Sequence, residues 1–563
     1  MKTLLCQINT TPNDFKTNMD QIIAGIRHGI KEKVDLVVLP ELAIPGYLCK
    51  DMMFRKGFVE QNLDCLNRLV NNICSGESPH VVVGYIDRNY SGEGKPFRNM
   101  AAVIKNGRIV ATYQKALLPF YDVFDEGRYF QPGTDRAVVE IRGEKWGICI
   151  CEDLWNDKGS DDYNYRFNPV ENYRTRGIYN IISINSSPFV RGKPKKRMDM
   201  VLSIAGSVGK VIYCNQMGGQ DELVFDGNSF IVERNRVRSC AGLEKYQIYD
   251  SELESDQWGS LLREETYDML KLGLQDYIRK SRFERVVVGS SGGIDSAVVL
   301  SLACDAIGPD NVYGIRMPST ISSDHSKNDA EQLHKNLGCH DHLVPIDHMS
   351  FVNRIRDGLP IEGTINPVAN ENIQARLRGL VLMYFSNAYN ALLLSTGNKT
   401  ELALGYCTLY GDMNGGFCPI NDLYKMKVYE TARLYNDRSN KEIIPNNILT
   451  KAPSAELAPG QTDEASLLPY PVLDTIVKGY VEHFIGDFKS FQTYCFGAEH
   501  FAAGETSTLA LNKWFLTPTA EQEYNRMIRL INNNEFKRRQ AAPGIKVTPI
   551  AFGIGRRLPI VKG

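Results

Sequence analysis

The sequence has little of what marks a membrane or a secreted protein. No apolar run in its 563 residues reaches the roughly 18 residues that a membrane-spanning helix needs. Met1 leads into the apolar stretch Leu4–Ile8, with no basic leader or small-residue cleavage site. The thirteen cysteines are odd in number and form no Cys-x-x-Cys pair, so we expect neither a disulfide framework nor a zinc site. We therefore expect a soluble protein of the reducing cytoplasm.

An excess of charge of either sign is also missing. Lys and Arg number 65 and Asp and Glu number 66, which gives a formal net charge of −1. Proteins that bind nucleic acid usually carry a basic excess. We therefore expect no nucleic-acid partner and no membrane partner, and small molecules as the substrates. Internal repeats and low-complexity tracts are absent as well.

What the sequence does contain is the pattern of an α/β protein with more than one domain. At about 100–200 residues per domain, its length predicts at least two domains. Short apolar runs bounded by Pro, Gly or Asn alternate with amphipathic stretches. The segment Asp250–Gly259 is acidic and aperiodic, and apolar residues recur at helical spacing after it, from Leu262 to Ile278. We predict one domain at 1–250, a linker at 251–260 and a second domain at 261–563.

In the second half, a buried strand at Val286–Gly289 runs into a loop of serine and glycine. Gly292 and Gly293 would let the backbone approach an anion closely, and a helix from about Ala297 would point its first N–H groups at the same place. The Gly-Lys-Ser/Thr of a Walker A loop is missing. A carboxylate at an anion site, here Asp295, is explained by Mg²⁺ that bridges it to phosphate oxygens. The alternative is a tight strand-to-helix turn without a ligand.

The string Ser291-Gly-Gly-Ile-Asp-Ser296 resembles the signature of the ATP pyrophosphatase superfamily. Later segments narrow the resemblance to the NAD synthetase family, and these are Asn370–Arg378, Ser395–Glu401, Gly405–Asp412, Asp422–Lys425 and Lys451–Leu457. The resemblance covers about residues 260–545. It implies a doubly wound parallel sheet of the adenine nucleotide alpha hydrolase type. It also implies an enzyme that cleaves ATP to AMP and pyrophosphate.

The resemblance implies a role for each matching residue. ATP would be bound by Gly289, Ser290, Ser291, Gly292, Gly293, Ile294, Asp295, Ser296, Arg376 and Thr396. Deamido-NAD would be bound by Asn372, Glu401, Tyr406, Cys407, Thr408, Leu409, Lys425 and Lys537. Asp295 and Glu401 would hold Mg²⁺. For the triplet Lys537–Arg539, a solvated charged face is the alternative.

In the first half, Glu41, Lys115 and Cys151 each lie where a strand-like run ends. Such ends are where α/β folds collect active sites. The residue types suit amide hydrolysis, because a thiolate can attack the carboxamide carbon, a carboxylate can move the proton and an ammonium can stabilise the oxyanion. Each residue alone has an alternative: a cysteine in a strand is usually an inert core residue, and Glu or Lys after a strand is usually solvated.

Local segments strengthen the hydrolase interpretation. Leu39–Leu42, Tyr113–Pro119, Phe124–Phe130 and Cys151–Trp155 resemble the nitrilase superfamily, in particular the glutaminase domains that are fused to NAD synthetases. The resemblance covers about residues 1–245 and implies an αββα sandwich. It implies Glu41 as base, Lys115 as oxyanion stabiliser, Cys151 as nucleophile and Glu126 as a supporting carboxylate. Glutamine would be bound by Tyr121, Ser187 and Lys193.

The two halves together predict ATP-dependent amidation of deamido-NAD with ammonia released from glutamine. The products would be NAD, AMP, pyrophosphate and glutamate, formed through an NAD-adenylate. The resemblance also implies an ammonia tunnel and a homodimer through the synthetase domain. Separately, the polar composition of Ile321–Lys327 and Ala452–Asp463, rich in Pro and Ser, predicts that these loops are lids over the nucleotide site. Two alternatives stay open. One is an ammonia-dependent synthetase with an inactive nitrilase-like scaffold, and the other is an amidase with a regulatory nucleotide module.

Overall fold

The chain folds into two compact units, Met1–Met269 and Leu270–Gly563. The computed structural model describes residues 1–157, 165–253, 255–258, 265–359, 363, 366–454, 456–458, 461, 463, 467–497 and 505–562. Residues 254, 259 and 260 of the predicted linker lie outside the described residues, as does Leu262, and the domain limits remain a prediction. Within the described ranges, no helix is both long and apolar enough to cross a membrane. All thirteen cysteines are free thiols.

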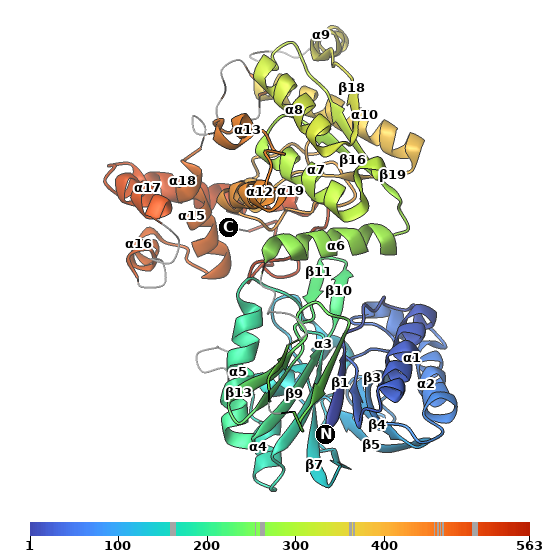
Figure 1. The fold of residues 1–563 in the computed structure, drawn as a ribbon. Coiled ribbons are helices and arrows are strands. Elements are labelled where there is room, and N and C mark those ends of the chain that lie inside the picture. The colour runs from blue at the N-terminus through green and yellow to red at the C-terminus, as the bar shows by residue number, and fades with distance from the viewer. Residues whose placement is uncertain are drawn as a thin grey trace. The chain divides into compact units, whose positions relative to one another are not determined.

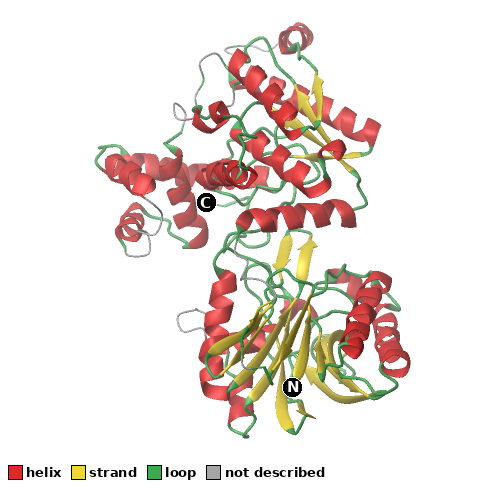
Figure 2. Ribbon diagram, in the orientation of Figure 1, coloured by secondary structure: helices red, strands yellow, loops and turns green. Residues whose placement is uncertain are grey.

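Two large sheets form the first unit (Figures 1 and 2). The six-stranded sheet has the order β14-β1-β2-β3-β4-β5. Its strands are β1 (Lys2–Cys6), β2 (Leu36–Val38), β3 (His80–Arg88), β4 (Phe97–Lys105), β5 (Arg108–Gln114) and β14 (Tyr246–Asp250). The seven-stranded sheet has the order β15-β13-β12-β9-β8-β7-β6. Its strands are β6 (Val138–Ile141), β7 (Glu144–Ile150), β8 (Asn180–Asn185), β9 (Lys210–Asn215), β12 (Phe230–Glu233), β13 (Arg236–Cys240) and β15 (Gln257–Trp258).

Alternation along the strands explains why the two sheets pack face to face. Val38 and Val82 of the first sheet share one buried cluster with Ile148 and Ile182 of the second. Side chains one position away point outward and meet helices. Val37 and Val81 pack with α1 (Phe15–Lys31), and Ile181 and Val211 pack with α5 (Lys193–Val208). The predicted αββα sandwich is confirmed.

Shorter elements complete the first unit. They are α2 (Phe58–Arg68), α3 (Glu126–Tyr129), α4 (Pro169–Arg174), the hairpin strands β10 (Met217–Gln220) and β11 (Leu223–Asp226), and the turns η1 (Lys50–Phe54), η2 (Leu69–Ile73) and η3 (Cys151–Asp157). The short helix η3 follows β7 directly, and β7 lies between β8 and β6 in its sheet. A residue at the start of η3 is therefore surrounded by neighbouring strand ends.

The second unit contains a four-stranded parallel sheet in the order β18-β17-β16-β19. The strands are β16 (Arg285–Ser290), β17 (Val312–Arg316), β18 (His340–Leu343) and β19 (Ala391–Leu394). In chain order this is 3-2-1-4, so the winding reverses between β16 and β19. The helices α7 (Ile294–Ile307), α8 (Asp324–Leu337) and α10 (Val368–Tyr389) pack on the sheet. The predicted doubly wound fold is confirmed, and its ligand crevice is expected at the carboxyl ends of β16 and β19.

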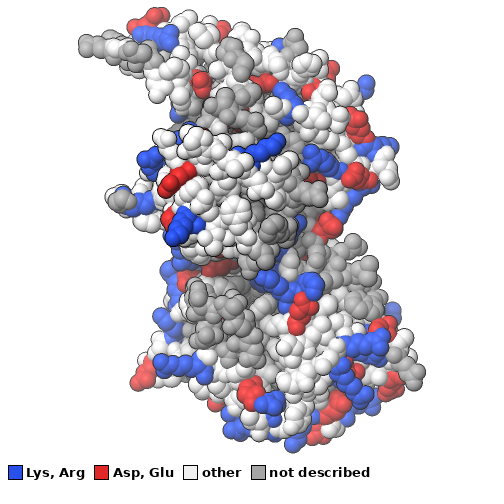
Figure 3. Space-filling model, turned by 90° about the vertical axis from the view of Figure 1, so that its left-hand side faces the viewer, with Lys and Arg blue, Asp and Glu red and all other residues white. Residues whose placement is uncertain are grey.

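Further helices complete the second unit. They are α6 (Thr266–Lys280), η4 (Pro309–Asn311), α9 (His348–Gly358), α11 (Lys399–Leu404), α12 (Lys425–Ser439), α13 (Asn446–Thr450), α15 (Tyr470–Glu482), α16 (Phe488–Phe496), α17 (Glu505–Phe515), α18 (Ala520–Asn533) and α19 (Glu535–Arg538). Four of them, α15 to α18, share an aromatic core in which the rings of Phe491 and Tyr524 lie 4.9 Å apart. Charged side chains of both signs occur among the described residues on the face shown in Figure 3, as the net charge of −1 leads one to expect.

Candidate active sites

Three strand ends of the first unit bring Glu41, Lys115 and Cys151 together. Glu41 lies just beyond β2, and Lys115 and Cys151 follow β5 and β7 directly. The Nζ atom of Lys115 lies 2.7 Å from Oε1 of Glu41, and neither side chain is exposed. Glu and Lys residues that follow strands are usually solvated. The burial of these two side chains therefore favours the predicted catalytic role over a solvated position at the surface.

Glu126 supplies a second carboxylate to the same lysine. Its two oxygens lie 2.9 and 2.8 Å from Nζ of Lys115, and the hydroxyl of Tyr47 donates to it at 3.0 Å. Burial alone would lower the pKa of Lys115, but Glu126 and Glu41 outweigh it and hold that pKa well above its usual range. Burial raises the pKa of Glu126 to about 7, against the opposing charge of Lys115. Lys115 is therefore a fixed cation.

Glu41 is oriented by groups from three different strand ends. Asn99 donates to its Oε1 at 2.8 Å, and the backbone N–H of Ser186 donates to its Oε2 at 3.0 Å. The backbone behind it is packed so closely that a Cβ at Gly84 would lie 2.2 Å from the nitrogen of Leu42. Only glycine fits at that position, so Gly84 determines how near the Glu41 turn comes to the sheet.

Cys151 has a left-handed backbone conformation, with φ of 47° at the start of η3. Strict alternation predicts that Cys149 and Cys151 share a face, and this prediction is wrong. Cys151 clusters with Ile148 and Ile150, whereas Cys149 belongs to the cluster on the other face of the sheet. The cause is that β7 ends at Ile150, so the strand alternation stops before the thiol. Strained conformations of this kind recur at active sites.

The thiol of Cys151 rests in its protonated form. Burial and then the charge of Glu41 raise the pKa of Cys151 well above its usual range, and Lys115 acts in the opposite direction. A buried thiol with a raised pKa is a poor nucleophile unless a base removes its proton. The carboxylate of Glu41 is a group of the right type beside it.

The three residues predicted to bind glutamine lie around the same place. Tyr121 donates to both oxygens of Glu152, at 3.0 and 2.9 Å, and Tyr165 donates to the same carboxylate at 3.1 Å. The backbone N–H of Ser187 donates to Asn215 at 2.9 Å, and Nζ of Lys193 lies 5.7 Å from the ring centroid of Phe124. Sequence reasoning missed Glu152, for which adjacency to Cys151 was the only signal.

In the second unit, a cavity of about 290 Å³ opens at the carboxyl ends of β16 and β19. Many of the predicted residues line it, and these are Gly289, Ser290, Ser291, Gly292, Gly293, Ile294, Asp295, Ser296, Thr396, Glu401, Tyr406, Thr408 and Lys425. The helix after the loop is α7, which begins at Ile294 and not near Ala297 as predicted, so Asp295 and Ser296 lie in its first turn. Gly292 has φ of 77°, and a Cβ there would lie 2.3 Å from the carbonyl oxygen of Ser326. Glycine is therefore required in this loop.

Lys425 lies between the two carboxylates that were predicted to hold Mg²⁺. Its Nζ is 2.6 Å from Oδ2 of Asp295 and 2.9 Å from Oε1 of Glu401. Burial alone would lower the pKa of Lys425, but the two carboxylates outweigh it and raise that pKa. Asn398 donates to Asp295 at 2.9 Å and forms a capping box with Glu401 at the start of α11. Lys425 lines the cavity, and its ammonium pairs with the carboxylates of Asp295 and Glu401.

The donor set at this point suits a divalent cation in part. Burial raises the pKa of Glu401 to about 7, and the charge of Lys425 acts to lower this pKa while the charge of Asp295 acts to raise it. Among the described residues, no group of three or more His, Cys, Asp and Glu side chains is arranged to hold a metal ion. Mg²⁺ commonly takes only one or two carboxylates and completes its shell with phosphate oxygens and water. Asp295 and Glu401 fit that pattern.

Five other predicted residues lie at the edge of this cavity or outside it. Lys537 donates to the carbonyl oxygens of Gly405 and Cys407, at 2.8 and 2.9 Å. Arg376 donates to the carbonyl of Leu409 at 3.2 Å, and Asn372 accepts from Thr408 at 2.8 Å. Cys407 lines a small neighbouring pocket. These contacts support the turn at 405–409, and the roles of these residues in binding remain predictions.

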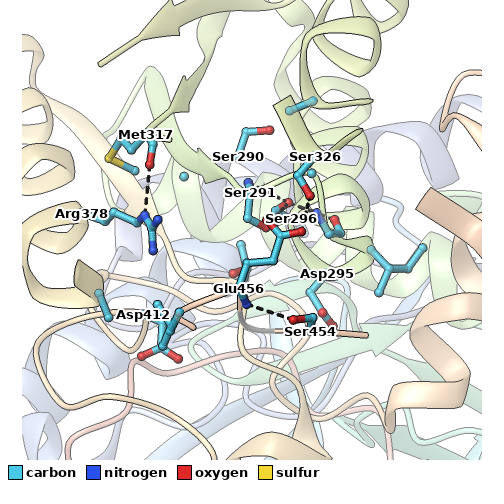
Figure 4. Close-up of a pocket in the computed structure, with 18 of the residues that line it drawn as sticks. Ser290, Ser291, Asp295, Ser296, Met317, Ser326, Arg378, Asp412, Ser454 and Glu456 are labelled. Carbon is cyan, nitrogen blue, oxygen red and sulfur yellow. Dashed lines mark hydrogen bonds between the residues drawn. The ribbon is translucent and has the colours of Figure 1, made fainter. Parts of the chain in front are cut away.

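The cavity also contains charged residues that sequence reasoning did not assign. Arg378 donates to the carbonyl of Met317 at 3.1 Å, and burial lowers the pKa of Arg378. Glu456 accepts from Ser323, Ser326 and Lys451, at 2.9, 2.7 and 2.6 Å. In the view of Figure 4, Glu456 lies between Arg378 and the serine loop. The signal was present, because Arg378 and Lys451 belong to segments that carried the resemblance.

The two segments predicted as lids contribute these serines and Glu456. Residues 455, 459, 460 and 462 of the second segment lie outside the described residues. In the described part, Ser454 lines the cavity beside Glu456, and the backbone N–H of Glu456 donates to its hydroxyl at 3.1 Å (Figure 4). Closure of either segment over the cavity remains a prediction.

Two family models match the chain. The model described as carbon-nitrogen hydrolase matches residues 3–238, and the model described as NAD synthase matches residues 266–490. The glutamine-dependent NAD(+) synthetase of Synechocystis sp. is 38% identical, with 99% of this chain and 98% of the relative covered. The synthetase of the same name from Thermotoga maritima is 36% identical, with coverage of 100% and 98%. The solved structure of glutamine-dependent NAD+ synthetase from Acinetobacter baumannii with ADP is 32% identical, with a TM-score of 0.74 and coverage of 99% and 98%.

Proposed function

The chain belongs to the glutamine-dependent NAD(+) synthetases, and from this membership we propose which of its residues perform each half of the reaction. The enzyme is a ligase that makes NAD from deamido-NAD with ATP as co-substrate and glutamine as the source of nitrogen. The comparisons give no support to a synthetase whose first domain is an inactive scaffold. The observation that carries the assignment of residues is the pair of buried lysines, Lys115 and Lys425, each held between two carboxylates.

In the first unit, Cys151 is the nucleophile toward the carboxamide carbon of glutamine. Glu41 accepts the thiol proton as the carbon–sulfur bond forms, and Lys115 stabilises the oxyanion. The carbon–nitrogen bond then breaks, and Glu41 returns the proton to the leaving ammonia. Water attacks the resulting thioester, with Glu41 again as base, and glutamate is released. Glu126 keeps Lys115 protonated and oriented, and Tyr121, Ser187 and Lys193 bind the amino acid.

In the second unit, the loop from Gly289 to Ser296 and the first turn of α7 bind the phosphates of ATP. The nicotinate carboxylate of deamido-NAD attacks the α-phosphorus, and pyrophosphate leaves. Ammonia then attacks the acyl carbon of the NAD-adenylate, which gives NAD and AMP. Thr396 and Arg376 are assigned to ATP. Asn372, Glu401, Tyr406, Cys407, Thr408, Leu409, Lys425 and Lys537 are assigned to deamido-NAD.

Comparison of nitrogen sources tests this assignment as a whole. NAD formation from deamido-NAD, ATP and Mg²⁺ is measured with glutamine and, separately, with ammonium chloride. Both sources are expected to support the reaction in the unchanged protein. If neither source gives NAD, the assignment of the second unit is wrong.

The thirteen free thiols, among them a nucleophile that must stay reduced, support a reducing cytoplasmic location.

Removal of divalent cations is expected to separate the two half-reactions. Asp295 and Glu401 would hold Mg²⁺, which when bound would offset the charge of the ATP phosphates. Treatment with EDTA should therefore abolish NAD formation from ammonium chloride, and added Mg²⁺ should restore it. Glutamate release from glutamine, measured in the same samples, should change by less than about twofold, because Glu41, Lys115 and Cys151 need no metal. Unchanged NAD formation in EDTA would contradict the metal assignment.

The exposed face of α10 supports a homodimer through the second unit. Leu380 and Tyr384 lie one turn apart on this helix and are 65% and 77% exposed, and Tyr389 and Leu343 add further apolar surface. Large apolar side chains that lie exposed on one helix often mark an interface between subunits. The double variant Leu380→Glu/Tyr384→Glu is expected to sediment as a smaller species than the unchanged protein. An unchanged sedimentation coefficient would show that this face is not the interface.

A further inference from the structure

One buried carboxylate in the first unit connects the segments that carry Lys115 and Cys151. Asp153 has no exposed surface, and its side chain accepts four hydrogen bonds. Its Oδ1 accepts from the backbone N–H groups of Ala116 and Leu117, at 3.1 and 2.9 Å. Its Oδ2 accepts from the backbone N–H of Ile150 and from the hydroxyl of Tyr113, both at 2.9 Å.

These four donors flank both catalytic residues. Ala116 and Leu117 follow Lys115 directly, Tyr113 precedes it by two positions, and Ile150 immediately precedes Cys151. The strands concerned belong to different sheets, β5 to the six-stranded sheet and β7 to the seven-stranded sheet. A single side chain therefore fixes the end of one sheet against the end of the other, at the position where nucleophile and cation must meet.

We propose that Asp153 is a positioning residue for amide hydrolysis, which sets the place of the Lys115 ammonium relative to the Cys151 thiol. The inference rests on the roles proposed above for those two residues. Asp153 touches neither substrate nor the reacting atoms in this scheme. It acts through the backbone, because only a group with two acceptor oxygens satisfies four donors that converge from two sides.

The same geometry explains why an amide cannot replace the carboxylate. Asparagine has one acceptor oxygen, and its amino group would point hydrogens at the two donors that one carboxylate oxygen now satisfies, either Ala116 and Leu117 or Ile150 and Tyr113. Burial raises the pKa of Asp153 to about 6, while the hydrogen bonds that it accepts and the charge of Lys115 oppose that rise. The anion is therefore maintained by these donors, as expected for a structural acceptor.

The test uses the full-length enzyme with the variants Asp153→Asn and, as a control on the surface of α5, Asp199→Asn. Active sites are first counted with a diazoketone analogue of glutamine that alkylates the nucleophile. The turnover number for glutamine is then expressed per alkylated site. We expect Asp153→Asn to lower this number by roughly 10²-fold, the effect of a misplacement of about 1 Å, with KM for glutamine changed by less than about threefold. NAD formation from ammonium chloride should stay within about twofold, and Asp199→Asn should change nothing.

A purely structural role would reduce the number of sites that can be alkylated but leave the turnover number per site unchanged, and that result would overturn the proposal. If Asp153→Asn yields no folded protein, Tyr113→Phe decides, because it removes one donor and leaves the three backbone donors in place. A fall of about threefold or more per site supports the proposal, and an unchanged value overturns it. If the unchanged enzyme itself fails to hydrolyse glutamine, the roles of Cys151 and Lys115 are wrong, which is a different failure.

Discussion

Cys151→Ala is expected to abolish NAD formation from glutamine while NAD formation from ammonium chloride is kept. Loss of a catalytic nucleophile lowers the turnover number by roughly 10⁴-fold or more. No other thiol replaces it, because Cys149, two residues away, belongs to the cluster on the opposite face of the sheet. The measurement is the initial rate of NAD formation with each nitrogen source, together with glutamate release.

Cys149→Ala is the matched control for this experiment. It removes a fully buried thiol from β7, the strand that directly precedes Cys151, and is expected to cost about 1 kcal/mol of stability through a small cavity. Its rates with both nitrogen sources should remain near those of the unchanged protein. If Cys151→Ala still used glutamine, the assignment of the nucleophile would be wrong. If ammonium alone supported NAD formation even in the unchanged protein, the first domain would be a scaffold.

Lys425→Met is expected to have the second large effect, and to remove activity with both nitrogen sources equally. The substitution leaves Asp295 and Glu401, whose side chains are only 17% and 18% exposed, side by side without the ammonium that lies 2.6 and 2.9 Å from them. Breaking a buried ion pair from one side destabilises a protein by about 3–5 kcal/mol. The loss of a preorganised cation beside the ATP phosphates should lower the rate by roughly 10²–10³-fold. Rates with each nitrogen source and thermal unfolding midpoints measure the two effects.

Lys427→Met provides the control, since Lys427 lies on the same helix and pairs with Glu430 at the surface. It is expected to change neither the rate nor the unfolding midpoint appreciably, because exposed ion pairs contribute about 0–1 kcal/mol. Equal losses in Lys425→Met and Lys427→Met would show that the helix, rather than the buried cation, is what matters. A loss confined to glutamine would place Lys425 in the other half-reaction, contrary to the proposal.

The positions of the first-unit residues could be predicted because each follows a recognisable strand. Glu41, Lys115 and Cys151 terminate apolar runs, and strand ends at one edge of a sandwich converge. The side-chain direction of Cys151 could not be predicted in this way. It depends on the positive φ of Cys151 at the start of η3, which no pattern of apolar residues reveals. The contacts of Asp153 were equally hidden, because three of its four donors, Tyr113, Ala116 and Leu117, are distant from it in sequence.

In the second unit, the serine-glycine loop was predictable as an anion site, and the fold places it at the expected reversal of strand order. Pairings between side chains were not. Lys425 was predicted to bind deamido-NAD, and nothing in the sequence indicates that it also pairs with two carboxylates from α7 and α11. Lys537 was likewise predicted to bind deamido-NAD, and nothing in the sequence indicates that its ammonium donates to carbonyl oxygens of the 405–407 turn. Tertiary packing determines which groups pair in this way, and a single sequence does not reveal that packing.

The burial of Lys115 and Lys425, the two lysines to which we assign roles in the reaction, has a practical consequence for amine chemistry. Lys115 is 0% exposed and Lys425 is 3% exposed, so an acylating reagent or an activated support cannot reach either in the folded protein. Surface lysines such as Lys195, whose side chain is 67% exposed, would react in their place. The enzyme could therefore be immobilised through its amines with both reaction centres preserved. Activity would be lost only when the coupling is extensive enough to modify the half-buried Lys193 and Lys451.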